Sequence, residues 1–291
     1  MSNNPLRRIP SVNELLENPS LRRLVDKVSH NVVVGEVRSF LDNLRTDLQQ
    51  RASDIRIPAP GELAEKIAEW IVTDQTPRLR PVINGTGVLL HTGLGRAPLP
   101  RAAIDEIQVV ASGYASVEVD LESGQRSQRM RAVDKLLVEL TGAEAALVVN
   151  NNAAATLLAL TALAAGREVV VSRGHLVEIG GSYRLPEVMT ASGAQLREVG
   201  TTNKTRIADY ERALQEGTAA LMRVHPSNYV ISGFTEEVAL RDLVAVGRRH
   251  NLPVIDDVGS GALVDFSRWG LRGEPLVRQS IIEGADLVLF S

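Results

Sequence analysis

Several features that define whole classes of proteins are missing from this sequence. Its 291 residues include no cysteine, which excludes disulfides, thiolate metal sites and a cysteine nucleophile and fits a reducing cytoplasm. No apolar run approaches the length of a membrane span, and residues 1–10 do not form a secretory signal. The net charge of −3 excludes nucleic-acid binding through the field of the whole molecule and leaves only local basic patches. We therefore expect a cytoplasmic protein that does not enter a membrane.

The composition is that of an ordinary folded protein, and the first third of the chain is expected to be helical. Apolar residues make up 44% and charged residues 23%, which argues against disorder. Ser11 with Glu14 has the form of a capping box, and Asn18-Pro19 can start a second helix. Apolar residues then recur at helical spacing before a proline-rich segment at 76–81. We place a helical N-terminal domain and linker at residues 1–80 and a second domain at residues 81–291.

The second domain shows short β-rich runs that alternate with helical stretches. This alternation predicts βαβ units, and hence an α/β fold with a mainly parallel sheet and helices on both faces. Ligands of such sheets bind at the carboxyl ends of the strands and at the N-termini of the following helices. The expected strands are 145–149, 168–172, 195–199, 220–224, 253–258 and 285–290.

The first of these strand ends carries a run of asparagines. Asn150, Asn151 and Asn152 lead into an Ala/Leu-rich helix that begins near Ala153. The open N–H groups of such a helix start can bind a phosphate, although asparagine is also a preferred N-cap with no ligand at all. The GxGxxG and GxxxxGKS fingerprints of nucleotide-binding proteins are missing.

A second strand end carries two adjacent acids, Asp256 and Asp257, before the turn Gly259-Ser260-Gly261. A partly buried carboxylate can pair with a metal ion, an arginine or a protonated ring nitrogen, and paired acids also suit Mg²⁺. The alternative is that one acid caps the turn while the other is solvated.

A glycine-rich segment, 83–98, contains His91 and Arg96. Loops this rich in glycine are more often functional than not, although turns alone also require glycine. Further along, a cluster of arginines could bind phosphate or a neighbouring subunit, or form a solvated helix face. Its members are Arg126, Arg129 and Arg131.

Taken together, five collinear motifs resemble the bacterial selenocysteine synthases, the L-seryl-tRNA(Sec) selenium transferases. The motifs are VINGTG to HTGLGR, TGAE to NNNAAA, SRG to EIGG, EVGTTNKT and DVGSG, between residues 82 and 261. The resemblance extends over essentially the whole chain. It implies the large domain of a fold-type-I pyridoxal 5′-phosphate (PLP) transferase, preceded by a small helical domain that holds tRNA, in a homodecamer built from dimers.

The resemblance also implies a reaction and roles for individual residues. The enzyme would convert seryl-tRNA(Sec) to selenocysteinyl-tRNA(Sec), with PLP as cofactor and selenophosphate as selenium donor. Asp257 would keep the pyridine nitrogen protonated, and Arg96, with His91 beside it, would belong to the site for the donor. The remaining expected cofactor contacts are Asn151, Asn152 and Ala153 at the phosphate, with His175, Ser227 and Asn228 as further candidates.

The sequence also departs from the family pattern. Gly93 stands where relatives often have asparagine, His175 where a carboxylate or amide is expected, and Ser127 where a glycine is usual. The family continues beyond Ser291 through a Ser-Gly-Asp-Lys turn, whose Schiff-base lysine binds the cofactor, into a small C-terminal domain. We therefore expect a chain truncated before that lysine and inactive alone. The lysines present lie in unrelated contexts: Lys27, Lys66, Lys135 and Lys204.

Two other functions fit the same residues. A PLP-dependent lyase or aldolase-type relative acting on amino sugars or small amino acids would have much the same site. A noncatalytic remnant would bind tRNA without turnover. The helical N-terminal region favours the tRNA enzyme over a relative that acts on small molecules, because such a relative has little use for a tRNA-binding domain.

Overall fold

The computed structural model of the protein describes all residues except 1–8, 51–56, 76–78, 180–182 and 272. The chain divides into two units, Met1–Ala97 and Pro98–Ser291, whose positions relative to each other are not determined. Each unit has a hydrophobic core of its own. No described helix is both long enough and apolar enough to span a membrane.

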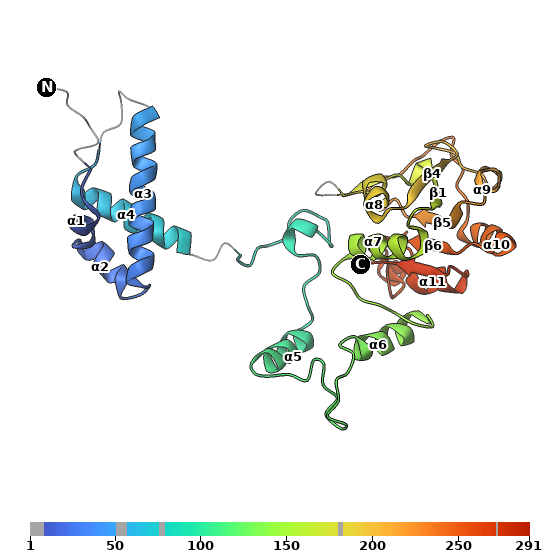
Figure 1. Cartoon of the computed structure of the whole chain (residues 1–291), viewed down its shortest axis with the longest axis horizontal. Coiled ribbons are helices and arrows are strands. Elements are labelled where there is room, and N and C mark those ends of the chain that lie inside the picture. The colour runs from blue at the N-terminus through green and yellow to red at the C-terminus, as the bar shows by residue number, and fades with distance from the viewer. Residues whose placement is uncertain (1–8, 51–56, 76–78, 180–182, 272) are drawn as a thin grey trace. The chain divides into compact units, whose positions relative to one another are not determined.

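The first unit is built from helices α1 (Val12–Leu16), α2 (Pro19–Val25), α3 (His30–Gln50) and α4 (Pro60–Gln75) (Figure 1). The Ser11 side chain accepts from the Glu14 N–H, and the Asn18 side chain accepts from the Ser20 N–H, so both residues are N-caps. Of the expected capping box at Ser11 and Glu14, the structure shows the Ser11 half. The expected apolar stripes of α3 and α4 are also buried. They form a core that includes Val33, Val37, Leu41, Leu63, Ile67 and Ile71.

The second unit contains a five-stranded sheet in the order β4-β1-β5-β6-β7, and all of its pairings are parallel. This arrangement confirms the α/β fold class. The carboxyl ends of parallel strands lie along one edge, where the candidate residues of several strands can gather. The strands are β1 (Glu168–Ser172), β4 (Gln195–Val199), β5 (Thr218–Val224), β6 (Val254–Asp257) and β7 (Leu287–Leu289).

Helices cover both faces of this sheet, as Figure 1 shows. On one face, α7 (Asn152–Ala164) and α8 (Leu185–Ser192) pack against alternate residues of β1 and β5. On the other, α9 (Ile207–Ala213) and α10 (Leu240–His250) pack against the intervening residues. Strands buried on both faces read as continuous apolar runs, which is why the sequence reveals them.

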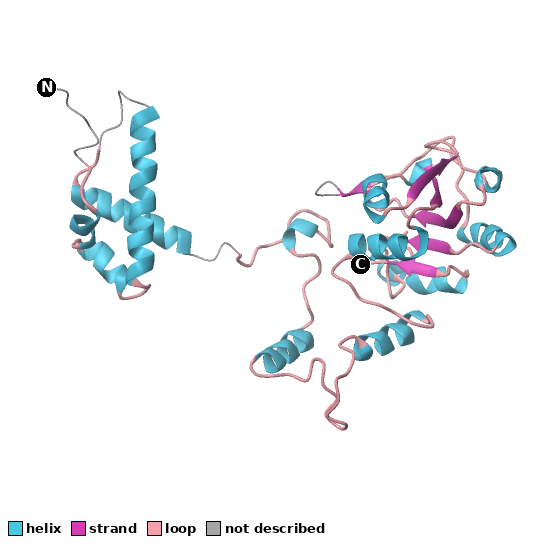
Figure 2. Cartoon of the chain, in the orientation of Figure 1, coloured by secondary structure: helices cyan, strands magenta, loops and turns pink. Residues whose placement is uncertain are grey.

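The expected strand at 145–149 is not formed. The segment lies between α6 (Arg131–Thr141) and α7, and Figure 2 shows it as loop. An extended segment becomes a strand only when a neighbour pairs with its N–H and C=O groups, and no strand of the described sheet pairs with it. Leu147 is accordingly 67% exposed.

Shorter elements complete the second unit. Helix α11 (Val277–Ile282) contacts β7 and α6, and α5 (Arg101–Ala111) buries none of its residues. A small antiparallel pair, β2 (Glu178–Ile179) and β3 (Tyr183–Arg184), precedes α8. The single-turn 3₁₀ helices are η2 (Thr92–Leu94), which lies in the first unit, and η3 (Arg173–His175) and η4 (Phe266–Trp269) in the second.

Candidate active site

The carboxylate of Asp257 is the centre of the site. It ends the buried strand β6 and is only 2% exposed. Its Oδ1 accepts hydrogen bonds from Asn152 Nδ2 at 2.7 Å and from the Gly259 N–H at 3.1 Å. Its Oδ2 lies 3.1 Å from the Thr156 hydroxyl. The fold therefore joins two of the predicted residues, Asn152 and Asp257, which are 105 positions apart in sequence.

The start of α7 lies beside this carboxylate. Asn151 is the N-cap, and its side chain accepts from the Ala154 N–H at 2.9 Å. Asn152 and Ala153 occupy the first turn, where a helix offers no carbonyl partners to its N–H groups and carries a partial positive charge. Asn151 therefore caps the helix, and the first turn still has the chemistry of an anion site.

The two adjacent acids of β6 do not converge on one ligand. Asp256 is turned to the opposite face of the sheet, where Arg223 binds it with two hydrogen bonds of 2.7 and 3.1 Å. No group of three or more metal-ligating side chains occurs among the residues that the structure describes. This arrangement does not support the Mg²⁺ interpretation of the acid pair.

Burial governs the electrostatics of Asp257. Loss of water raises the pKa of its carboxyl above the usual value, and the charge of Asp256 acts in the same direction. The hydrogen bonds from Asn152, Gly259 and Thr156 oppose this rise, because they favour the ionised form. A carboxylate held this way binds a cationic N–H donor strongly, since little solvent competes with it.

One buried polar atom points to a polar ligand beside Asp257. Within the described part of the chain, Asn152 Oδ1 has no hydrogen-bond partner, and the Tyr183 hydroxyl has only the nearby Thr156 hydroxyl to interact with. Burial, followed by the nearby charge of Asp257, raises the pKa of Tyr183 to about 12, so its hydroxyl stays protonated. A buried carboxylate, a helix start suited to an anion and the unpaired Asn152 Oδ1 together fit PLP, which carries a ring nitrogen and a phosphate.

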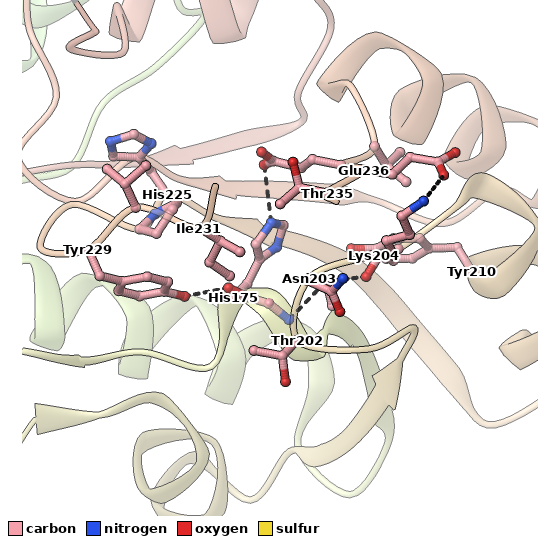
Figure 3. A pocket seen from close by; sticks show the side chains of 17 residues that line it. His175, Thr202, Asn203, Lys204, Tyr210, His225, Tyr229, Ile231, Thr235 and Glu236 are labelled. Carbon is pink, nitrogen blue, oxygen red and sulfur yellow. Dashed lines mark hydrogen bonds and ion pairs between the residues drawn. The ribbon is translucent and has the colours of Figure 1, made fainter. Parts of the chain in front are cut away.

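His175 lies in a different environment from the one its predicted role suggests. It ends η3, and its Nε2 lies 3.2 Å from Glu237 Oε1. It lines a cavity of about 240 Å³, and Figure 3 shows its side chain there with that of Tyr229. There the Tyr229 hydroxyl donates to the Gly174 carbonyl. Neither Asn152 nor Asp257 lines this cavity. Contact between His175 and the cofactor ring therefore stays a prediction.

The histidine of this cavity affects the acid beside it. The hydrogen bond from His175 lowers the pKa of Glu237, and burial lowers the pKa of the neighbouring His225. At the rim, Lys204 Nζ lies 3.3 Å from the ring centroid of Phe234 and 4.0 Å from Glu236. Its ammonium group is thus already engaged.

The residues that follow β5 take different positions. Ser227 lies next to Gly259, since a Cβ added to that glycine would stand 3.7 Å from Ser227 Cβ. Asn228 instead donates from Nδ2 to the Glu178 carbonyl at 2.9 Å, and so holds the backbone of β2. Ser227 is the better placed of the two to reach the Asp257 site.

His91 and Arg96 belong to the first unit, so their position relative to Asp257 is not determined. Both lie around the single turn η2, where the Arg96 N–H donates to the His91 carbonyl at 3.0 Å. Arg96 has a φ of 62°, which is uncommon for a residue with a side chain. Gly93 makes room for the imidazole, because a Cβ there would stand 3.2 Å from the ring. Their role at the donor site stays a prediction.

The arginine cluster is partly neutralised by one acid. Arg126 and Arg129 bind the two oxygens of Glu118 at 2.8 and 2.6 Å. These bonds lower the pKa of the Glu118 carboxyl. At least two of the three arginines therefore help to hold their own loop.

Sequence reasoning missed three residues of the site. Thr156 follows Asn152 by one helical turn and so shares its face of α7, a signal that the spacing did contain. Gly259 was named only as part of a turn. For Tyr183, nothing in the local sequence indicates a position beside Asp257.

Two family models and the curated relatives indicate the same family for this chain. The family model described as L-seryl-tRNA selenium transferase matches residues 82–291, and the model described as selenocysteine synthase N terminal matches residues 6–45. The chain is 53% identical over 290 residues to an L-seryl-tRNA(Sec) selenium transferase of Moorella thermoacetica, covering 100% of this chain and 61% of the relative. A protein of the same description from Geobacter sulfurreducens is 50% identical over 284 residues. The match covers 98% of this chain and 62% of that relative.

A solved structure supports the fold alone. D-glucosaminate-6-phosphate ammonia-lyase superposes with a TM-score of 0.54 at 23% identity, covering 69% of this chain and 51% of that one. The chain spans about 61% of the length of the first curated relative.

Proposed function

Because the chain belongs to the L-seryl-tRNA selenium transferase family, we propose that it serves the conversion of seryl-tRNA(Sec) to selenocysteinyl-tRNA(Sec), with PLP as cofactor and selenophosphate as donor. The observation that carries the proposal is the 53% identity over 290 residues, which extends through both units. The alternative small-molecule lyase rests on a likeness of fold at 23% identity, which does not define a substrate.

Asp257 acts at the ring of the cofactor. When bound, PLP supplies an electron sink that allows a proton to leave the α-carbon of the seryl group and the β-hydroxyl to be eliminated. The sink requires a protonated pyridine nitrogen, and the buried carboxylate of Asp257 is suited to hold that proton by a charge-assisted hydrogen bond. Asn152 fixes the carboxylate through its 2.7 Å bond to Oδ1.

The cofactor phosphate binds at the start of α7. Asn151 occupies the N-cap, and Asn152 and Ala153 contribute N–H groups of the first turn. The same helix therefore holds the phosphate and, through Asn152, the carboxylate that faces the ring nitrogen. His175, Ser227 and Asn228 are further candidates for contact with the cofactor.

Arg96, with His91, receives the selenium donor. A guanidinium suits the tetrahedral anion of selenophosphate because its fork of N–H groups binds such oxygens in pairs. The left-handed backbone of Arg96 supports a functional constraint at this position.

The first unit holds the tRNA, and copies of the chain assemble. The N-terminal family model covers α1, α2 and most of α3, which share a core of their own. In the second unit, α5 exposes apolar side chains that a neighbouring copy would cover, in the decamer that the family resemblance implies. They are Ile104, Ile107, Val109 and Val110.

The test is a tRNA-dependent selenium transfer assay with the protein as its gene encodes it. Seryl-tRNA(Sec) labelled in the serine is incubated with PLP and selenophosphate, and the amino acid is released and identified. We expect labelled selenocysteine as the product. The rate of its formation should fall by at least about a hundredfold in Asp257→Asn. It should not change in Thr161→Val, since Thr161 is exposed on the same helix. Ammonia release from D-glucosaminate 6-phosphate without reaction on seryl-tRNA would support the small-molecule alternative. Binding of tRNA without turnover would support the noncatalytic alternative.

A further inference from the structure

The hydroxyl of Thr156 has one proton and lies near three oxygens: the Asn152 carbonyl; Asp257 Oδ2, which accepts that proton when Asp257 is charged; and the protonated Tyr183 hydroxyl, which can itself donate to Thr156. Thr156 is completely buried on α7. Its Oγ1 lies 2.9 Å from the Asn152 carbonyl, one turn back in the helix, and 3.1 Å from Asp257 Oδ2. A hydroxyl donates one hydrogen bond at a time. The direction of its proton therefore depends on whether the Asp257 carboxyl is charged.

The two oxygens of that carboxylate have unequal partners. Oδ1 accepts from two N–H groups, of Asn152 and Gly259, which donate in either charge state. Oδ2 has the Thr156 hydroxyl as its one recorded partner among the described residues. If Oδ2 carried a proton, it would donate to Thr156, and Thr156 would turn to the Asn152 carbonyl. If Oδ2 is charged, Thr156 turns to it and stabilises the charge.

We propose that Thr156 is a positioning residue, whose hydroxyl keeps the Asp257 carboxylate charged and in one orientation for the pyridine nitrogen of PLP. The inference rests on the proposed function, in which Asp257 faces the cofactor. Thr156 acts through Asp257 and does not itself touch the reacting atoms. Its effect is large because the pair is buried, where the usual competition from water is absent.

Helix α7 offers a matched comparison. Thr161 also donates to the carbonyl four residues back, from Oγ1 to Leu157 at 2.8 Å, but it is exposed. The two threonines make the same contact with the helix, and only Thr156 is bonded to Asp257. Substitution of Thr161 therefore measures the effect of removing a helix back-bond alone.

The experiment uses pyridoxamine 5′-phosphate labelled with ¹⁵N in the ring, which binds without a covalent link to the protein. Its affinity is measured by fluorescence titration on the whole chain, and the ¹⁵N resonance reports whether the bound ring nitrogen is protonated. The variants are Thr156→Val, Thr156→Ala, Thr156→Ser, Thr161→Val and Asp257→Asn. Thermal unfolding verifies that each variant is folded. If Thr156→Val does not fold, Thr156→Ala decides the test.

We expect Thr156→Val and Thr156→Ala to bind the probe about tenfold more weakly, because a hydrogen bond to a charged group is lost. Their ring nitrogen should shift toward the unprotonated position, whereas Thr156→Ser and Thr161→Val should match the unaltered protein. The inference is overturned if Thr156→Ala is folded and keeps both the affinity for the probe and the protonated ring nitrogen. It is also overturned if Thr156→Ser loses as much affinity as Thr156→Ala. The proposed function fails separately if Asp257→Asn binds the probe as the unaltered protein does, and both fail if the unaltered protein does not bind it.

Discussion

At the scale of single residues, the end of β6 shows how one strand separates two chemically identical side chains. Asp256 is paired with Arg223 on one face, while Asp257 lies against α7 on the other. Alternation along a strand is enough to divide them. The partner of each then determines its chemistry. Of the two, Asp257 alone has a carboxylate oxygen to which no N–H group of the described residues donates.

The first residue-scale prediction concerns Asp257→Asn. Burial raises the pKa of Asp257 in the folded state, so the folded protein binds that proton more tightly than the unfolded chain. The contribution of Asp257 to stability is therefore present at low pH and is lost as the pH rises through the folded pKa. Asparagine does not titrate and can keep the bonds to Asn152 and Thr156. We expect the variant to gain stability relative to the unaltered protein as the pH rises through this window.

Urea unfolding at a series of pH values measures this difference. Subtracting the two curves removes the contributions of the other acids, such as the Asp256 ion pair, which both proteins share. A difference in unfolding free energy that stays constant with pH would show that Asp257 has an ordinary pKa.

A second residue-scale prediction concerns Gly261, in the turn after β6. It has a φ of +64°, and a Cβ there would meet Val258 at 2.9 Å and Val277 at 3.0 Å. Gly261→Ala should lower the free energy of unfolding by about 3 kcal/mol, from backbone strain and overpacking together. Gly270→Ala, with φ +79° and open space around it, should cost only about 1 kcal/mol. Equal effects in chemical denaturation would contradict the packing part of the argument.

At the scale of elements, the helices of the first unit form a small structure with its own core. Nine residues of α1 to α4 are buried in one cluster. The capping side chains fix where α1 and α2 begin, and the apolar stripes of α3 and α4 decide which faces meet. The described helices bury these residues against one another, so we expect them to fold without the sheet.

We therefore predict that residues 1–80 fold when expressed alone. Their helical circular dichroism should be lost in one cooperative transition. Val33→Ala should destabilise this fragment by about 2 kcal/mol, since Val33 is fully buried. Val32→Ala, one position earlier and 36% exposed, should change stability by less than about 0.5 kcal/mol. A fragment without a cooperative transition would place the domain boundary beyond residue 80.

At the scale of the whole molecule, apolar surface indicates further contacts. Helix α5 has a regular apolar periodicity, yet none of its residues is buried. Contiguous exposed apolar surface on a folded chain marks an interaction site or promotes aggregation. The element therefore fits a chain that associates with other copies of itself.

We expect the protein to self-associate in a concentration-dependent manner. Ile107→Asp should shift sedimentation velocity profiles toward smaller species, because it places a charge on the apolar face of α5, where Ile107 is 54% exposed. Gln108→Asp adds the same charge at an exposed polar position and serves as control. A single small species in the unaltered protein, at every concentration, would contradict the proposed assembly.

Local sequence patterns were enough to predict most of the elements and most of the site candidates. The caps at Ser11 and Asn18, the continuous apolar strands and the asparagine at the start of α7 are all set by neighbours a few residues away. Local patterns of this kind are readable without a fold. The collinear motifs likewise indicated the family, which the comparisons confirmed.

Which of these residues meet depends on the packing of the folded chain. It joined Asn152 and Thr156 to Asp257, brought Tyr183 close to them, and placed His175 against Glu237 in a cavity that Asp257 does not line. It also left 145–149 without a strand partner. The physical reason is that such contacts depend on strand order and on helix packing across more than a hundred residues of chain, whereas sequence periodicity reports only the immediate neighbours of each residue.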